Sequence, residues 1–125
     1  MAYQYIEYKF PVEYNFEKMI WWADSICRVY FAIKGKDTDS WSYYSGNASH
    51  VLATGNLLVS QVSEADAVTN YLRKTPDANG KVVAVLPTTT TGKYIRIYVD
   101  DANDNPTQIY EFRPSTQMLA DEIVA

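Results

Sequence analysis

An aromatic stretch near the middle of the chain, with acidic and amide residues around it, is the first place where this sequence could bind a ligand. Sugars present flat apolar faces edged by hydroxyl groups, so a carbohydrate site pairs exposed aromatic rings with hydrogen-bonding side chains. We therefore predict a carbohydrate site here, and the alternative for Trp41 is a packing role in the core. The predicted ligand-binding residues are Trp41, Tyr43, Tyr44, Asp37, Asp39 and Asn47.

A run of carboxylate and amide side chains between residues 100 and 105 is the second candidate. Calcium takes roughly six to eight oxygen ligands, which such a loop can supply. The spacing lacks the glycine and the final glutamate of an EF-hand loop, and the same residue types are common in ordinary hairpin loops. We expect no cofactor otherwise, so calcium is the one metal that the sequence suggests. Its predicted ligands are Asp100, Asp101, Asn103 and Asp104.

Nucleophilic catalysis needs a base beside a nucleophile, and the sequence offers no convincing pair. The single histidine, His50, follows Ser49 in a predicted loop, and adjacent loop residues do not make a catalytic dyad. The single cysteine, Cys27, can form no internal disulfide and has no metal-ligand spacing to His50. Because Cys27 falls in an alternating apolar run, we expect it to be buried. We expect no enzymatic activity.

Charge and hydropathy exclude further partners. The net charge is −4, the pI is about 4.8 and the Lys and Arg residues are dispersed, which argues against nucleic acid. No apolar run approaches the length of a membrane span, and the opening residues do not resemble a signal peptide. The chain contains 11 tyrosines. Tyrosine favours strands and also serves at binding surfaces, so this surplus suits a β-sheet or a ligand platform.

Alternating apolar and polar residues predict the strands that must position these clusters. The alternation is clearest over residues 27–34 and 93–99. In the first of these, Cys27, Val29, Phe31 and Ile33 share one face. A short polar loop after residue 99 predicts an antiparallel hairpin with the next strand. The other predicted strands span residues 3–10, 16–22, 51–62, 81–86 and 107–113, and the first of them should end at Pro11.

Residues 63–72 have helical features. Ser63 can cap this segment, and Ala65, Val68 and Leu72 share a face. Residues 77–80 form a strong turn signal. Seven or eight strands with at most one short helix predict an all-β, antiparallel β-sandwich over residues 1–114. Residues 115–125 change character, look helical, and would form a C-terminal tail or the start of a following element.

Three segments carry a resemblance to a known family: Lys93-Tyr94-Ile95-Arg96-Ile97-Tyr98, Ile109-Tyr110-Glu111-Phe112-Arg113, and Tyr30-Phe31-Ala32-Ile33 with the later Asp39-Ser40-Trp41-Ser42-Tyr43. They resemble the discoidin, or coagulation factor 5/8 type C, group of galactose-binding-like domains. The resemblance implies a jelly-roll β-sandwich that recognises surface ligands, with the Trp after the middle strand usually packed. The family's opening segment, with its own Trp and acidic loop, has no counterpart here.

A second resemblance concerns the end of the chain. Residues 111–115 and 119–123 are similar to the junction in phage tail and host-specificity proteins where a β-domain meets a fibre region. This resemblance implies an extracellular or virion-associated protein.

Two functions follow as hypotheses. In the first, the domain is a non-catalytic recognition or spacer domain of a surface or phage tail protein, and a glycan on a cell surface is its partner. In the second, the aromatic faces contact neighbouring domains or subunits of an oligomeric particle, a homo-oligomer included, with no small ligand. A compact aromatic cluster with converging polar groups would favour the first, and a broad flat patch the second.

Overall fold

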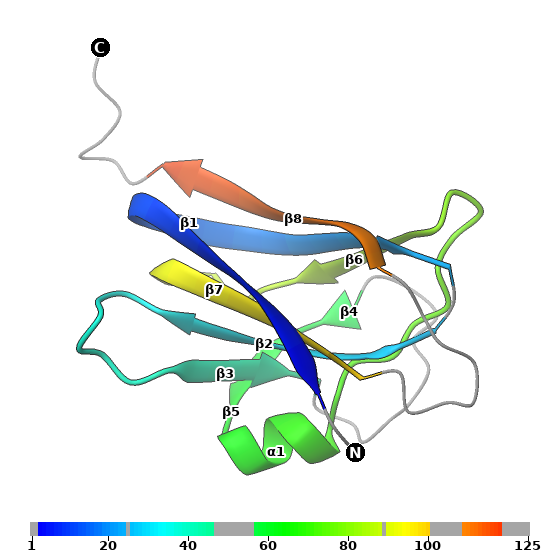
Figure 1. Cartoon of the computed structure of the whole chain (residues 1–125), viewed down its shortest axis with the longest axis horizontal. Helices are drawn as coiled ribbons and strands as arrows, with labels where there is room; N and C mark the ends of the chain where they lie inside the picture. Colours follow the sequence, from blue (N-terminus) through cyan, green and yellow to red (C-terminus); the bar gives the residue numbers. More distant parts are fainter. Residues whose placement is uncertain (1–2, 25, 47–56, 89, 101–108, 119–125) are drawn as a thin grey trace.

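The computed structural model describes residues 3–24, 26–46, 57–88, 90–100 and 109–118, which form an all-β fold with one short helix (Figure 1). The elements are β1 (Gln4–Ala23), β2 (Arg28–Lys34), β3 (Ser42–Ser45), β4 (Leu57–Leu58), β5 (Ser60–Val62), α1 (Glu64–Thr69), β6 (Lys81–Val85), β7 (Thr91–Asp100) and β8 (Ile109–Met118). The strands make one sheet in the order β4-β6-β1-β7-β2-β3-β5, and β8 also pairs with β1. The predicted all-β class is confirmed.

Strand β1 is the longest element and joins the two halves of the sheet. Its first arm, residues 4–10, pairs with β7. Its second arm, residues 14–23, pairs with β8 on one side, and on the other side first with β7, at Tyr14 and Asn15, and then with β6, over residues 18–22. The register with β7 shifts between Lys9 and Tyr14, and Figure 1 shows the strand bending sharply there. The predicted break at Pro11 is therefore wrong. Pro11 lies between Lys9 and Tyr14, where the register with β7 shifts. Proline has no backbone N–H to donate, and no hydrogen bond between the strands needs one at this position.

The bend brings the two halves of the sheet face to face. In Figure 1 the second arm and β8 lie above β7, β2 and β3. Trp21 of the second arm packs edge-on against Phe31 of β2, with ring centroids 5.8 Å apart. Both side chains are buried, as are Phe16, Ile95 and Ile97. The core therefore lies between the two halves, which is the sandwich-like arrangement that the sequence predicted.

The predicted hairpin between the last two strands is wrong. β7 pairs with β1 and β2, whereas β8 pairs with β1 in an antiparallel register that includes Trp21↔Phe112. The first arm of β1 thus pairs with β7 where the hairpin would have placed β8. The second arm pairs with β8 where the hairpin would have placed β7. β8 also continues through Pro114, paired with Met19, to Met118. Residues 115–118 therefore extend the sheet and are not helical, and residues 119–125 lie outside the described residues.

The helix and its surroundings follow the sequence in part. Ser63 caps α1 as predicted, since its hydroxyl accepts a hydrogen bond from the Asp66 backbone N–H at 3.1 Å. The helix is shorter than expected and buries Ala67, not Ala65. Leu72 lies beyond the helix and forms an antiparallel bridge with Val29 of β2. Burial in this region thus comes mainly from the chain that follows the helix.

The tight turn before β6 forms as its residues predict. Gly80 has a φ of 80°, a conformation that glycine adopts without strain. The Asp77 side chain accepts hydrogen bonds from the backbone N–H groups of Asn79 and Lys81 at 2.8 and 2.9 Å. These two bonds hold the pKa of Asp77 below its ordinary value. The carboxylate therefore fixes the turn while it is ionised.

Candidate binding face

The side of the sheet opposite the core carries a row of aromatic and charged side chains, which we call the outer face. It consists of Tyr5, Glu7, Tyr30, Lys34, Trp41, Tyr43, Arg96 and Tyr98. Alternate residues of the first arm, β7, β2 and β3 supply most of it, because successive side chains of a strand point to opposite faces. Trp41 comes from the residue just before β3 and reaches the face through its contacts with Arg96 and Lys34. The register aligns Tyr5 with Tyr98 and Tyr98 with Tyr30 across three strands. The fold therefore gathers on one surface residues that are far apart in sequence.

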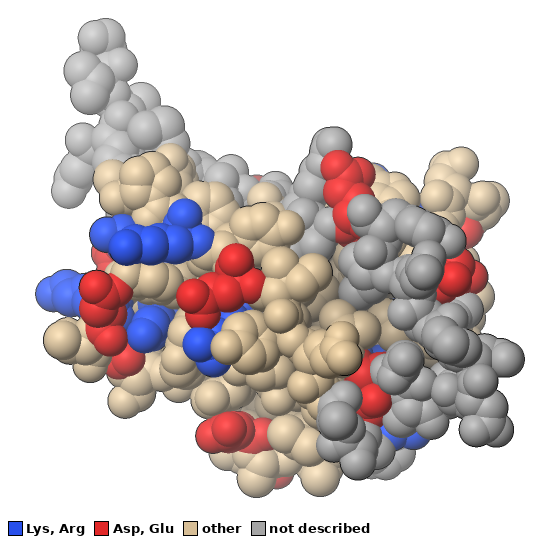
Figure 2. Space-filling model, viewed as in Figure 1, with Lys and Arg blue, Asp and Glu red and all other residues tan. Residues whose placement is uncertain are grey.

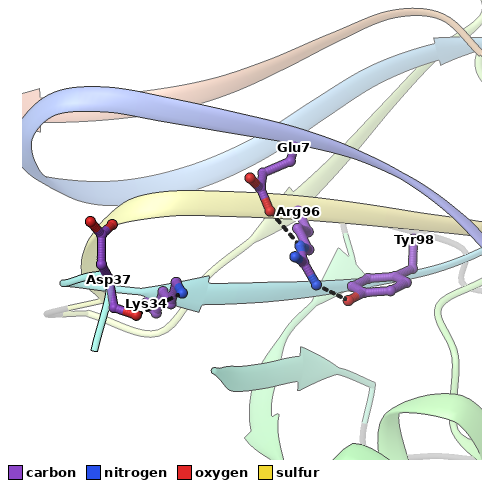
Figure 3. Close-up of polar contacts among 5 residues, drawn as sticks. All are labelled: Glu7, Lys34, Asp37, Arg96 and Tyr98. Atoms are coloured by element: carbon purple, nitrogen blue, oxygen red, sulfur yellow. Dashed lines mark hydrogen bonds and ion pairs between the residues drawn. The ribbon is translucent and has the colours of Figure 1, made fainter. Parts of the chain in front are cut away.

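Arg96 is at the centre of the outer face. Its guanidinium carbon lies 4.3 Å from the ring centroid of Tyr5 and 4.2 Å from that of Trp41. Its Nε donates to a carboxylate oxygen of Glu7 at 2.6 Å, and one terminal nitrogen donates to the Tyr98 hydroxyl at 3.0 Å (Figure 3). Burial lowers the pKa of Arg96, but the hydrogen bonds to Tyr98 and Glu7 outweigh this effect and raise it. The cation is thus charged and held in one orientation.

Tyrosine rings form a layer beside Arg96. Tyr30 and Tyr98 stack with centroids 4.4 Å apart and an interplanar angle of 8°, and Tyr5 lies 5.2 Å from Tyr98. Tyr43 lies 6.4 Å from Tyr30, and its hydroxyl hydrogen-bonds to Glu64 at the start of α1. Burial, followed by the charge of Glu64, raises the pKa of Tyr43. Tyr30 is itself buried at 5% exposed and supports the layer from beneath, whereas Tyr5, Tyr43 and Tyr98 are at least partly exposed and present a rigid apolar surface.

Lys34 completes the cationic side of the outer face. Its ammonium nitrogen lies 4.8 Å from the Trp41 ring centroid and 5.1 Å from that of Tyr94. It also donates to the backbone carbonyl of Asp37 at 3.3 Å, which ties the β2–β3 turn to the face (Figure 3). In Figure 2 charged side chains of both signs are interleaved at the left of the view, where Figure 1 places this turn. The face therefore offers both donors and acceptors.

The predicted ligand residues divide among three locations. Trp41 and Tyr43 lie half-buried on the outer face, beside Arg96. Tyr44 is 8% exposed and packs in the core, because it points to the other side of β3. Asp37 and Asp39 belong to the β2–β3 turn, where an Asp39 carboxylate oxygen accepts from the Lys36 backbone N–H at 3.0 Å. Asn47 lies outside the described residues.

Sequence reasoning missed the other members of the outer face. Tyr5, at 52% exposed, carries the most accessible ring of the outer face. Glu7 and Arg96 supply hydrogen-bonding groups to the same face. The signal was present, since Tyr5 and Glu7 alternate along one strand while Arg96 and Tyr98 alternate along another. Only the pairing of the first arm with β7 brings the two sets together.

The acidic loop is described at a single position. Asp100 is the last residue of β7, is 3% exposed and lies 3.8 Å from a guanidinium nitrogen of Arg28. It therefore faces a cation from a neighbouring strand. Asp101, Asn103 and Asp104 lie outside the described residues, as does His50. Within the parts of the chain that the structure describes, no three metal-ligating side chains gather into a group.

Cys27 is buried at 4% exposed, as predicted. Burial, assisted by the charge of Asp24, raises the pKa of its thiol to about 12. A thiol is a nucleophile only as the thiolate. Cys27 is therefore a protonated core residue near neutral pH.

Comparisons with protein-family models, with curated proteins and with solved structures found no match to this chain. Within the described residues, no helix is both long and apolar enough to span a membrane. The geometry of the outer face is thus the basis on which a function can be argued.

Proposed function

We propose that this chain is a non-catalytic carbohydrate-recognition domain that binds a glycan on its outer face. The observation that carries the proposal is that the rings of Tyr5 and Trp41 lie against the fixed guanidinium of Arg96, with Tyr43 in the same row of the sheet. Flat rings match the apolar faces of sugar rings, and the surrounding charged groups match the hydroxyl edges.

The polar groups of the face support this choice. Glu7 and Glu64 offer carboxylate oxygens that accept hydrogen bonds from sugar hydroxyls, while Arg96 and Lys34 donate. Their existing hydrogen bonds hold them in place before a ligand arrives. Binding therefore costs less conformational entropy than it would with mobile side chains.

A glycan array probed with the whole chain tests the proposal. We expect Trp41→Ala to weaken binding about tenfold or more, because it removes a ring and the support of Arg96. Trp22→Ala is the matched control, since Trp22 is also half-buried near a lysine, 5.9 Å from the Lys81 nitrogen, but lies on the second arm of β1. Circular dichroism should show that both variants are folded.

Two results would contradict the proposal. One is that the unaltered chain binds no glycan at any protein concentration tested. The other is that Trp41→Ala and Trp22→Ala weaken binding equally, which would place the ligand elsewhere or make the loss a general effect of destabilisation.

A structural role in subunit contact is the second candidate. It is favoured by Tyr5, Ile6 and Val12, large side chains that are 52%, 46% and 39% exposed and that all lie on the first arm of β1 or in its bend. In the first role the domain would serve as a recognition or spacer domain of an extracellular surface protein or a phage tail. In the second it would contact neighbouring subunits of an oligomeric particle and bind no small ligand.

A further inference from the structure

We propose that the first arm of β1 pairs with the first arm of a second copy of this chain, in an antiparallel register centred on Tyr8. The first arm is bonded to β7 along one side, and along its other side no strand pairs with it among the described residues. In Figure 1 it crosses in front of β7 and β2. A strand edge of this kind presents backbone N–H and C=O groups that can pair with another strand.

The sequence of the arm suits a copy of itself. Pairing about Tyr8 places Glu7 of each chain opposite Lys9 of the other, so that two opposite-charge pairs form across the twofold axis. Charged residues on an edge usually discourage pairing between strands. In this register they attract, whereas a register centred on Glu7 would place two like charges together.

This register also covers an exposed apolar side chain on the other face of the arm. Ile6 is 46% exposed although it lies on the same side of the strand as Phe10, which packs against the core. In the pair, each Ile6 lies opposite Phe10 of the copy and is covered by it. The ribbon is limited to residues 6–10, because the bend and Pro11 follow directly.

Sedimentation velocity over a range of protein concentrations tests this inference, which does not depend on glycan binding. We expect a reversible dimer in the unaltered chain. Glu7→Lys and Lys9→Glu each place like charges opposite one another in a homodimer, and each should raise the dissociation constant about tenfold. Lys18→Glu makes the same charge change at an exposed position of the second arm and should leave the dimer unchanged.

An equimolar mixture of the two charge variants is the decisive measurement. The Glu7→Lys chain carries a lysine at both paired positions of its first arm, and the Lys9→Glu chain carries a glutamate at both. In a mixed dimer each lysine therefore lies opposite a glutamate, and the mixture should dimerise about as well as the unaltered chain. Glu7→Lys also breaks the ion pair with Arg96, so this variant alone could fail to dimerise because it is less stable. Recovery of dimerisation in the mixture would show that the loss came from the charges at the paired strands.

Two outcomes would overturn the inference. A chain that stays monomeric up to about 1 mM has no such interface. A dimer that neither charge variant weakens, or that the mixture fails to restore, uses another surface.

Discussion

Replacing Gly92 by alanine should destabilise the fold, because the backbone of β7 approaches β2 too closely there to admit a side chain. A Cβ atom at Gly92 would overlap Cγ2 of Ile33 and lie 3.0 Å from the carbonyl oxygen of Lys34. Ile33 is buried at 2% exposed, and its branched side chain cannot turn away without displacing core neighbours. Gly92 also pairs with Tyr14, directly after the bend of β1.

The expected cost follows from two opposing terms. Overpacking of a core costs about 1–3 kcal/mol. Alanine also restricts the unfolded chain, which restores about 0.4–1 kcal/mol. The net loss for Gly92→Ala is therefore about 1–2 kcal/mol, which corresponds to a decrease in Tm of roughly 4–8 °C for a chain of this size.

Gly35→Ala is the matched control. A Cβ atom at Gly35 would lie 2.5 Å from Oε1 of Glu13, which is the end of an exposed side chain that can move. It would also lie 3.1 Å from Oδ2 of Asp39, so this carboxylate need shift by only a few tenths of an ångström. We expect its stability to change by less than about 0.5 kcal/mol. Urea unfolding followed by tryptophan fluorescence measures both variants. Equal stabilities for the two would refute the argument from close approach at Gly92.

Three further measurements test the electrostatics of the fold. Burial raises the pKa values of Cys27 and Tyr3 to about 12. Because the unfolded chain releases these protons at lower pH than the folded chain does, the stability of the fold should be full below about pH 9 and should fall as the pH rises toward 12. Thermal melts across this pH range measure the loss. A thiol reagent should label Cys27 only when denaturant unfolds the chain, and rapid labelling of the native protein would contradict its burial. Asp77→Ala should lower Tm at neutral pH, and the difference should shrink as acid protonates the aspartate through its lowered pKa.

Local signals in the sequence predicted the local structure well. Ser63 caps a helix, Gly80 forms a turn, and the alternation that begins at Cys27 places Phe31 and Ile33 in the core. Each of these depends on a few neighbouring residues and their own backbone preferences. The same reasoning failed at Pro11, where a tertiary bend removes the need for the hydrogen bond that proline cannot make.

The candidate site was harder to predict because it depends on strand order. Trp41 and Tyr43 were found as a local cluster, but Arg96 and Tyr5 reach them only because the first arm and β2 flank β7. A sequence shows which residues alternate and does not show which strands become neighbours. The predicted hairpin of β7 with β8 would have placed the wrong residues beside Arg96.

The central position of β1 also affects how the chain can fold during synthesis. Among the described residues, the pairing partners of β1 all follow it in the sequence, in residues 81–85, 91–100 and 109–118. Its apolar side chains therefore stay without their native partners until these later strands have been synthesised, and each pairing must close a long loop. We expect slow folding with a late, cooperative transition, and a nascent chain that ends before residue 91 leaves the first arm of β1 without its native partner.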